Sequence, residues 1–458
     1  MESRRERGID FQKLAKYSKH APRYTSYPTA VEFKPLKPEE IIPHLKGDKP
    51  LSLYFHLPFC RSACYFCGCN VVYTSKESKR RRYIDYLRKE LDIWSRYLDT
   101  SRVVRQLHFG GGTPTFFTPE ELEEVYQLIY SHFPNWEEGA EISIEIDPRF
   151  FSREHMEVLK KYGVNRISFG VQDFDPKTQR AVNRIQPFDL TREAVEIARE
   201  SGVIESINID LIYGLPYQTL ESFKKTLQLV KELDPDRVAV FNYAHVPWLK
   251  KGMRKIDETT LPSPEEKLKI FKYTIDFFEN NGYLMIGMDH FAKPEDELFK
   301  AIEKGELHRN FQGYTTKGGA DLIGFGLTSI SETDRAYFQN YKNLKEYESA
   351  IDRGELPVFR GVILNGEDLL RKYIIMEMMA NFAFDIKRFE ERFGVNFREK
   401  FKQELEELKE FEEGELIEIL DDKIIVNKTG TLLIRNIVLP FDEYYRKMGN
   451  KKVFSKSV

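Results

Sequence analysis

The chain has 458 residues, 41% of them hydrophobic, which is enough to bury a large core and to form more than one domain. Its 70 Lys and Arg residues nearly balance 73 Asp and Glu residues, and the formal net charge of -3 argues against a general nucleic-acid binder. The charged N-terminal residues and the lack of any apolar run of about eighteen residues predict a cytoplasmic protein with no signal peptide and no membrane span.

Residues 1–36 carry no helical or strand period. The segment Arg23-Tyr-Thr-Ser-Tyr-Pro-Thr29 favours an extended backbone because of its proline and β-branched residues. We therefore predict an extended N-terminal arm over residues 1–36. A disordered terminus is the alternative that the composition leaves open.

Short apolar strands alternate with amphipathic helices over residues 37–326, a pattern typical of repeated βα units around a parallel sheet. The predicted strands are 51–56, 103–109, 141–147, 166–171, 206–213 and 237–243, with a further one at 284–289. Six units are too few for a closed eight-stranded barrel, so we predict an α/β fold with an open, partial (β/α)6 barrel. The site of such a barrel lies at the C-terminal ends of its strands.

Helix signals separate these strands. Thr118 and Glu121 predict a capping box at the start of one helix, and Gly163 marks the end of another. An apolar stripe with spacings of three and four predicts a helix that contains Ile84, Leu87, Leu91, Trp94 and Leu98.

Beyond residue 327 the pattern changes to helices at 343–353, 368–381, 386–393 and 397–413, with no strands expected between them. Residues 414–427 then form two alternating strands around an Asp-Asp turn. We predict a mostly helical C-terminal domain over residues 327–458 with a small β-hairpin. Helices with a hairpin also suggest a DNA-binding winged helix, but the many acidic residues favour a lid or scaffold.

All four cysteines lie between Cys60 and Cys69. Thiolates bind soft metals, and the C-x3-C-x2-C spacing of Cys60, Cys64 and Cys67 lets one loop hold a single iron–sulfur cluster with one open iron. A structural zinc site would favour paired C-x2-C knuckles, and a disulfide framework is not expected in a long chain without a secretory signal. Unligated thiols are the third alternative. We leave Cys69 out of the predicted ligand set.

Polar side chains stand where predicted strands end, at Glu145, Gln172 and Asp210, and Arg184 follows one of these strands. Such carboxylates can accept hydrogen bonds from ribose hydroxyls, and an arginine can pair with an amino-acid carboxylate. The alternative is that each residue caps a loop or satisfies a neighbouring backbone group. Gly110–Gly112 would let a ligand approach the backbone closely, although a plain turn also explains three glycines.

The cysteine spacing, with Phe66 before the third cysteine, resembles the signature of the radical SAM enzymes, in which the open iron binds S-adenosylmethionine (SAM). Motifs along nearly the whole chain resemble those of the oxygen-independent coproporphyrinogen III oxidases, also called coproporphyrinogen dehydrogenases. They include Arg23–Thr29, Cys64–Asn70, His108–Thr115, Ile142–Pro148, Gly170–Phe174, Asn208–Pro216, Phe241–His245, Gly287–Ala292 and His308–Thr316.

This resemblance implies an oxidoreductase of haem biosynthesis that converts two propionates of coproporphyrinogen III into vinyl groups, giving protoporphyrinogen IX by way of a 5′-deoxyadenosyl radical. It implies a 4Fe-4S cluster held by Cys60, Cys64 and Cys67, and two SAM molecules. Tyr54, Gly111 and Glu145 would contact the SAM at the cluster. The second SAM would be lined by Phe66, Gly112, Thr113, Gln172, Arg184, Asp210, Ala244 and Ile330.

The resemblance also implies a reductant of the flavodoxin or ferredoxin type, and we expect a monomer that binds no nucleic acid. The four propionates of the substrate need cations, for which the candidates are Arg23, Lys250, Lys251, Arg254 and Arg309. Three alternatives stay open: a radical-SAM-like haem chaperone, a haem-degrading radical SAM methyltransferase, and a winged-helix regulator with a redox cluster. The chaperones lack the Gly68-Cys69 pair and the Tyr-Thr-Ser-Tyr-Pro arm that this chain carries.

Overall fold

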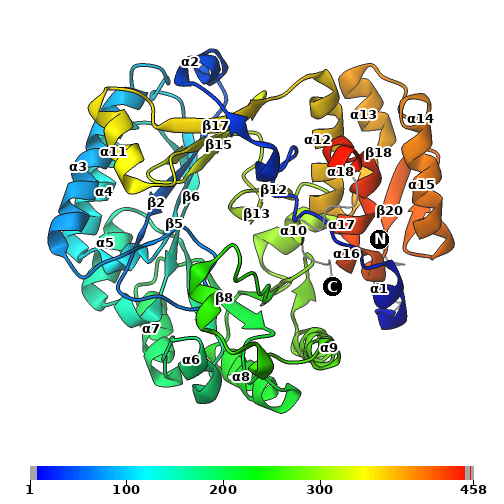
Figure 1. Cartoon of the computed structure of the whole chain (residues 1–458), viewed down its shortest axis with the longest axis horizontal. Helices are drawn as coiled ribbons and strands as arrows, with labels where there is room; N and C mark the ends of the chain where they lie inside the picture. Colours follow the sequence, from blue (N-terminus) through cyan, green and yellow to red (C-terminus); the bar gives the residue numbers. More distant parts are fainter. Residues whose placement is uncertain (1–7, 449–453, 455–458) are drawn as a thin grey trace.

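A computed structural model describes residues 8–448 and residue 454. A thirteen-stranded sheet forms its centre, and Figure 1 shows helices on the outer side of that sheet. Its parallel strands, in spatial order, are β14 (Asp321–Phe325), β2 (Leu51–Leu57), β5 (Val104–Gly111), β6 (Trp136–Ile146), β7 (Arg166–Gln172), β8 (Ser206–Tyr213) and β9 (Arg237–Asn242).

The six βα units predicted from the sequence are confirmed, and so is the open, partial barrel. Strand β2 is buried along nearly its whole length: Leu53 and Phe55 lie on one face, and Tyr54 and His56 on the other face line the interior of the barrel. The helices of these units are α3 (Glu77–Trp94), α4 (Pro119–His132), α5 (Arg153–Lys161), α6 (Pro176–Ala181), α7 (Phe188–Glu200), α8 (Leu220–Leu233) and α9 (Pro264–Asn280).

The predicted capping box at the start of α4 is also confirmed. The Glu121 backbone N–H donates to Thr118 Oγ1 at 3.2 Å, and the Thr118 N–H donates to the Glu121 carboxylate at 2.9 Å. Helix α5 begins after the N-cap Ser152 and is followed by Gly163, which has a φ of 75°.

The expectation that no strands lie between the helices at 343–353, 368–381, 386–393 and 397–413 is wrong, because strands occur at 358–363 and 383–385. Strands β15 (Ile330–Glu332), β16 (Ala336–Asn340) and β17 (Val358–Ile363) extend the large sheet antiparallel to one another, and β1 (Lys34–Pro35) pairs with β17. Strand β16 is buried at every position, so its sequence shows no polar–apolar alternation. The strand expected at 284–289 is replaced by two short antiparallel strands, β10 (Leu284–Met285) and β11 (His290–Ala292).

From residue 8 onward, the N-terminal segment lies across the C-terminal part of the chain as an arm, and residues 1–7 are outside the described part. The Tyr24 hydroxyl donates to the buried Asp442 carboxylate at 2.7 Å, and Tyr27 is fully buried. The expected lack of helix is wrong, because Asp10 caps α1 (Phe11–Tyr17) through two backbone N–H groups. Seven residues are too few to reveal a helical period.

The C-terminal region packs beside the barrel in Figure 1 and contains the expected hairpin, β19 (Ile417–Ile419) and β20 (Lys423–Val426). A third strand, β18 (Ala383–Asp385), pairs with β20. The surrounding helices are α12 (Gly366–Asn381), α13 (Ile386–Phe393), α14 (Phe397–Lys400), α15 (Lys402–Glu413), α16 (Lys428–Leu432), α17 (Ile434–Ile437) and α18 (Glu443–Met448). Among the helices formed by residues 8–448, none is both long and apolar enough to span a membrane.

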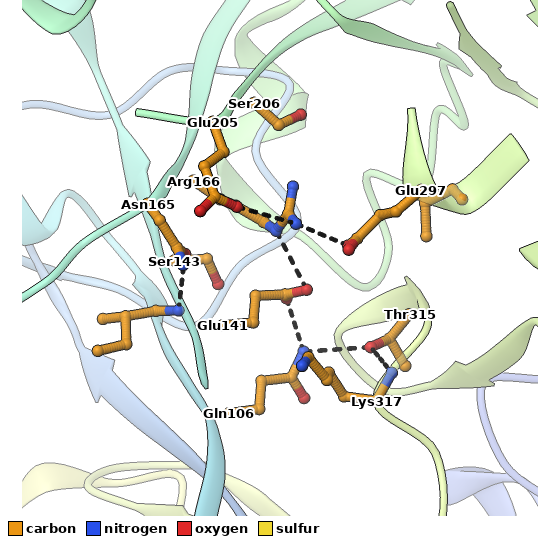
Figure 2. Close-up of polar contacts among 12 residues, drawn as sticks. Gln106, Glu141, Ser143, Asn165, Arg166, Glu205, Ser206, Glu297, Thr315 and Lys317 are labelled. Atoms are coloured by element: carbon orange, nitrogen blue, oxygen red, sulfur yellow. Dashed lines mark hydrogen bonds and ion pairs between the residues drawn. The ribbon is translucent and has the colours of Figure 1, made fainter. Parts of the chain in front are cut away.

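A polar network closes the barrel at the N-terminal ends of its strands (Figure 2). Gln106 donates to Glu141 at 2.8 Å and to Thr315 at 3.3 Å, and Arg166 pairs with Glu297 at 2.8 Å. Glu297 begins α10 (Glu297–Lys304), and Thr315 ends the hairpin of β12 (His308–Asn310) and β13 (Gly313–Thr315). These contacts fasten the segment 297–315 across the base of the barrel.

Glu90 on α3 links the barrel to the antiparallel extension of the sheet. Its side chain is fully buried and accepts hydrogen bonds from the Gly326 N–H at 2.8 Å, the Asn340 amide at 2.9 Å and the Tyr347 hydroxyl at 2.6 Å. Tyr347 belongs to α11 (Leu344–Asp352). Burial raises the pKa of Glu90 from its ordinary 4.5 to about 7, although these three donors oppose the shift.

The raised pKa predicts how Glu90→Gln changes stability with pH. In the wild type, the contribution of Glu90 is fully present below about pH 4.5 and is lost as the pH rises through about 7. At pH 5 the variant should lose about 1–3 kcal/mol of unfolding free energy, because an amide cannot accept all three hydrogen bonds. The deficit should shrink by pH 8, where the wild type must bury a charge. Urea unfolding between pH 5 and pH 8 measures both effects.

The exposed Glu120→Gln on α4 is the matched control and should show neither the deficit nor its pH dependence. A Glu90→Gln deficit that is equal at both pH values would contradict the assignment of a buried, largely protonated carboxyl group.

Candidate functional site

The cysteine loop leaves the C-terminal end of β2 and returns through two short paired strands, β3 (Phe59–Cys60) and β4 (Val72–Tyr73). The Val72 N–H donates to the Pro58 carbonyl at 2.7 Å, so both ends of the loop are held at the rim of the barrel. This is the end of the strands where the sequence predicted the site.

Gly112 lets the turn after β5 lie directly against the start of the cysteine loop. The Gly112 N–H donates to the Leu57 carbonyl at 2.8 Å, and the Thr113 N–H donates to the Phe59 carbonyl at 3.1 Å. A Cβ on Gly112 would lie 2.7 Å from the Phe59 carbonyl oxygen and 2.8 Å from that of Pro58. Only glycine fits this approach, which explains the last glycine of the Gly-Gly-Gly run.

Two arginines approach the sulfur of Cys64. Arg149 and Arg184 each donate an N–H to Cys64 Sγ at 3.7 Å, and Arg184 also pairs with Asp147 at 3.1 Å. Burial acts to raise the pKa of Asp147, but Arg184 and Arg149 hold it below its usual range. Two guanidinium groups and one carboxylate therefore leave a net positive charge beside Cys64 Sγ.

The other cysteines have polar neighbours as well. Cys60 Sγ lies 3.7 Å from Thr113 Oγ1, and burial raises the pKa of Cys60 to about 12. A hydrogen bond from the Cys69 thiol lowers the pKa of Cys67 to about 6. Cys69 thus contacts a predicted ligand without belonging to the predicted ligand set.

A cavity of about 480 Å³ opens beside the loop. This volume falls within the usual range for small-molecule sites. Four predicted SAM contacts line it: Tyr54, Gly111, Glu145 and Ile330. The other lining residues are His56, Gly68, Cys69, Asn70, His108, Lys250, Phe311, Gln312, Leu322, Thr328, Ser329, Gln339 and Lys342.

A chain of hydrogen bonds orients the polar groups on the strand side of the cavity. His56 Nε2 lies 2.9 Å from the Asn70 carbonyl, which can only accept, so Nδ1 accepts from the Tyr54 hydroxyl at 3.0 Å. Burial lowers the pKa of His56 to about 4 and keeps the ring neutral. His108 stacks on Tyr54 and contacts the Glu145 carboxylate at 3.2 Å. Tyr54 and Glu145 therefore present acceptor oxygens at the cavity.

The remaining predicted SAM residues lie around the cysteine loop and at neighbouring strand ends, and they do not line this cavity. A Cβ on Gly170 would lie 3.1 Å from both Arg184 Nη2 and Gln172 Nε2, so these two side chains meet at the end of β7. Asp210 on β8 accepts from Ser168 at 3.0 Å and from Asn208 at 2.8 Å. Burial raises the pKa of Asp210 to about 6.

Phe66 packs against the small apolar cluster formed by Val182, Leu215, Tyr243, Met253 and Ile256. Ala244 is exposed in the loop that follows β9.

Sequence reasoning assigned no role to the residues on the far wall of the cavity. Phe311 and Gln312 come from the turn of the β12–β13 hairpin, and Gln339 comes from β16. Both side-chain polar atoms of Gln312 are buried without a hydrogen-bond partner in the described part of the chain. A lone Phe-Gln in an irregular segment carries no periodic signal, although it stands inside a motif that resembles the family.

Two of the five predicted substrate cations gather near a buried carboxylate. Burial would raise the pKa of Asp289, but His290, Arg309 and Arg23 lower it to about 2. Arg309 Nε and Nη1 are buried and have no hydrogen-bond partner among the described residues. Lys250 lines the cavity. The structure does not bring Lys251 and Arg254 there, because both are exposed on the surface beyond it.

Comparison with known proteins adds an independent finding. A model of the radical SAM superfamily matches residues 54–230, and a model of the HemN C-terminal domain matches residues 364–433. An oxygen-independent coproporphyrinogen III oxidase of Helicobacter pylori (strain J99) is 56% identical over 98% of this chain and 99% of its own length. The protein of the same name from Escherichia coli K12 is 43% identical over 98% of each chain.

A solved structure, described as "Coproporphyrinogen III oxidase (HemN) from Escherichia coli is a Radical SAM enzyme", matches with a TM-score of 0.91 and 43% identity. The match covers 95% of this chain and 99% of the chain in that structure. The chain belongs to the oxygen-independent coproporphyrinogen III oxidases. Membership of this family confirms the resemblance read from the motifs and the radical SAM fold.

The superfamily works with a 4Fe-4S cluster and SAM, and the rim of this barrel fits both. Three thiols on one loop beside two guanidinium groups suit an anionic iron–sulfur cluster. Across residues 8–448, no three His, Cys, Asp or Glu side chains are arranged around a single metal ion. A cluster spreads its protein ligands over several irons, so its thiols need not converge on one point.

Gly112→Ala tests the close approach of the two loops. The added Cβ would meet backbone oxygens that cannot rotate away, so we expect the start of the cysteine loop to shift. The variant should unfold at a lower temperature and should bind less iron after anaerobic reconstitution with iron and sulfide. Gly68→Ala is the matched control, because nothing lies within 4 Å of its Cβ. Equal iron contents in the two variants would contradict the role given to Gly112.

Proposed function

We propose that this protein converts two propionate side chains of coproporphyrinogen III into vinyl groups, without oxygen and with loss of two carbon dioxide molecules. The observation that carries the proposal is the loop of three cysteines at the barrel rim, flanked by Arg149 and Arg184, beside a cavity of about 480 Å³. The hydrogen to be removed is β to a carboxylate and is not acidic enough for a side-chain base.

When bound, the cluster and SAM would supply a 5′-deoxyadenosyl radical that can remove this hydrogen atom. The remaining substrate radical must then lose carbon dioxide and pass one electron to an acceptor to leave the vinyl group. We propose Cys60, Cys64 and Cys67 as the cluster ligands, with Cys69 supporting Cys67 by a hydrogen bond. The protein positions the reactants and excludes water. Buried β2 and β5 hold the loop and the Gly110–Gly112 turn at fixed positions for that purpose.

Tyr54, Gly111 and Glu145 are the proposed contacts of the SAM at the cluster, because they line the cavity beside the cysteine loop. Tyr54 and Glu145 present oxygens that can accept hydrogen bonds from an amino group. The site of a second SAM is proposed at Phe66, Gly112, Thr113, Gln172, Arg184, Asp210, Ala244 and Ile330. The meeting of Arg184 with Gln172 and the position of Thr113 beside Cys60 support it.

Arg309, with Arg23 nearby, is the proposed anchor of a substrate propionate. Its Nε and Nη1 are buried without a hydrogen-bond partner among the described residues, and buried N–H groups are costly unless a ligand supplies acceptors. Phe311 and Gln312, on the same hairpin, line the cavity, so a carboxylate held by Arg309 would belong to a ligand that reaches this wall.

Cysteine variants test the ligand set. Cys60→Ser, Cys64→Ser and Cys67→Ser should each lose most of the reconstituted iron and its visible absorption, because a hydroxyl is a poor ligand for iron in a cluster. Cys69→Ser should keep the iron. The wild type, supplied anaerobically with dithionite, SAM and coproporphyrinogen III, should release 5′-deoxyadenosine together with a protoporphyrin species. Cleavage of SAM without decarboxylation would overturn the proposed activity.

Arg309→Gln should raise the KM for coproporphyrinogen III at least about tenfold, the ratio that corresponds to losing one charged hydrogen bond. SAM cleavage in the absence of substrate should stay near the wild-type rate, because the change is on the hairpin and not on the cysteine loop. Arg192→Gln, an exposed arginine on α7, serves as the control and should leave KM unchanged. An unaltered KM in a folded Arg309→Gln protein would remove this residue from the substrate site.

A further inference from the structure

The cysteine loop has an outer side that the cavity does not use. Arg61 and Ser62 are exposed there. Two segments hold the loop from outside the barrel: the Tyr65 N–H donates to the Val182 carbonyl at 2.9 Å, and the Asn183 amide donates to the Ala63 carbonyl at 2.7 Å. The loop therefore lies just beneath the protein surface, with two neighbouring loops at its sides.

Apolar side chains stand on this surface without any packing role. Trp248 and Leu249 are 71% and 70% exposed, and Ile185, two residues after Asn183, is 61% exposed. Among the described residues these are the three most exposed large hydrophobic side chains. Trp248 and Leu249 are attached firmly, because Met253 and Ile256 of the same segment are buried against Tyr65 and Phe66 of the cysteine loop. Exposed apolar groups held on a rigid base are typical of an interaction site.

Exposed cations follow Trp248 and Leu249 in the sequence. Lys251, Arg254 and Lys255 are exposed, and within the described structure none of them forms an ion pair. Lys255 Nζ lies 5.0 Å from the centre of the Tyr65 ring, which ties the basic segment to the cysteine loop. The carboxylates next in sequence are engaged locally: Asp257 caps the Thr259 N–H, and Glu258 contacts His245 at 3.0 Å. The surface is thus basic, although the whole chain has a net charge of -3.

The proposed reaction needs such a surface. Reductive cleavage of one SAM consumes one electron, and amino-acid side chains do not readily give up electrons, so a donor must bring it from solution to the cluster. Electron transfer falls steeply with distance, which favours docking where the cysteine loop lies closest to solvent. A small apolar centre with a charged rim is the usual form of a transient interface.

We propose that Trp248, Leu249, Ile185, Lys251, Arg254 and Lys255 form the docking surface for an acidic one-electron carrier protein of the flavodoxin type, which is oxidised by one electron at each encounter. The inference rests on the proposed function. Charge complementarity selects the partner, because unpaired lysines and arginines attract an acidic protein over distances comparable to the Debye length. A role as a lid over the substrate would require these side chains to face the cavity. Lys250 lines the cavity, but Lys251 and Arg254 do not.

Two variants test this surface separately by charge and by apolar contact. The charge variant is Lys251→Glu/Arg254→Glu, and the apolar variant is Trp248→Ala/Leu249→Ala. Anaerobic titration calorimetry at two salt concentrations compares the binding of each variant and of the wild type to a purified acidic flavodoxin. We expect each double variant to raise Kd about tenfold or more. The salt dependence of Kd should weaken in the charge variant. Lys402→Glu on α15, exposed and in a different part of the molecule, is the matched control and should leave Kd unchanged.

Activity with two reductants separates this inference from the proposed function. With reduced flavodoxin, both double variants should form 5′-deoxyadenosine at least about tenfold more slowly at low donor concentration. With dithionite, which needs no docking surface, both should match the wild type in rate and in the KM for coproporphyrinogen III. Equal losses with the two reductants, a raised substrate KM, or an unchanged Kd for flavodoxin would each overturn the docking surface. Loss of activity in the wild type with dithionite would instead overturn the proposed function.

Discussion

The contact of Gly112 with the carbonyls of Pro58 and Phe59 is the constraint on which the site depends. Two neighbouring parallel strands end side by side, and each continues into a loop that must turn outward within a few ångströms of the other. A side chain on Gly112 would force them apart. Because this approach is made of backbone, it fixes where the cysteine loop begins, independently of any group bound to it.

Charge is the second constraint on the rim. Thiolates and carboxylates close together would repel each other. Arg149 and Arg184 offset this repulsion, because both pair with Asp147 and both donate to Cys64 Sγ. Removing either arginine would leave a buried acid with half of its compensation. The same principle acts at Asp289, where His290, Arg309 and Arg23 hold the pKa of the buried carboxylate low, and Arg309 keeps two buried nitrogens without a hydrogen-bond partner among the described residues. Both places carry an excess of positive charge suited to anionic ligands.

The sequence predicted the parts of the fold that repeat. Each βα unit has its own apolar strand and amphipathic helix, so six strands and the Thr118 cap could be placed from local patterns. The strands that were missed depend on distant partners. Strand β14 pairs with β2 across about 270 residues of sequence, and its five buried residues include no alternation that would reveal a strand. Four cysteines within ten residues led to the prediction of a cluster loop, because cysteine is otherwise absent from the chain.

The far wall of the cavity shows why the rest of the site escaped prediction. Phe311, Gln312 and Gln339 come from a hairpin and an antiparallel strand that follow the last βα unit, whereas the cysteines follow the first parallel strand of that series. The wall is placed by contacts made at the opposite end of the barrel, where Arg166 holds Glu297 and Gln106 holds Thr315.

One segment, 297–315, thus closes the base of the barrel and carries Arg309, Phe311 and Gln312 toward the cavity. The side of the cavity next to the cysteines is built from the repeating βα units. These units lie largely within the residues that the radical SAM superfamily model matches. The opposite side is built from a segment that lies outside the residues matched by the superfamily model. The proposed substrate anchor Arg309 therefore lies outside the part of the chain that matches the superfamily model, and polar contacts at the base of the barrel hold its segment in place.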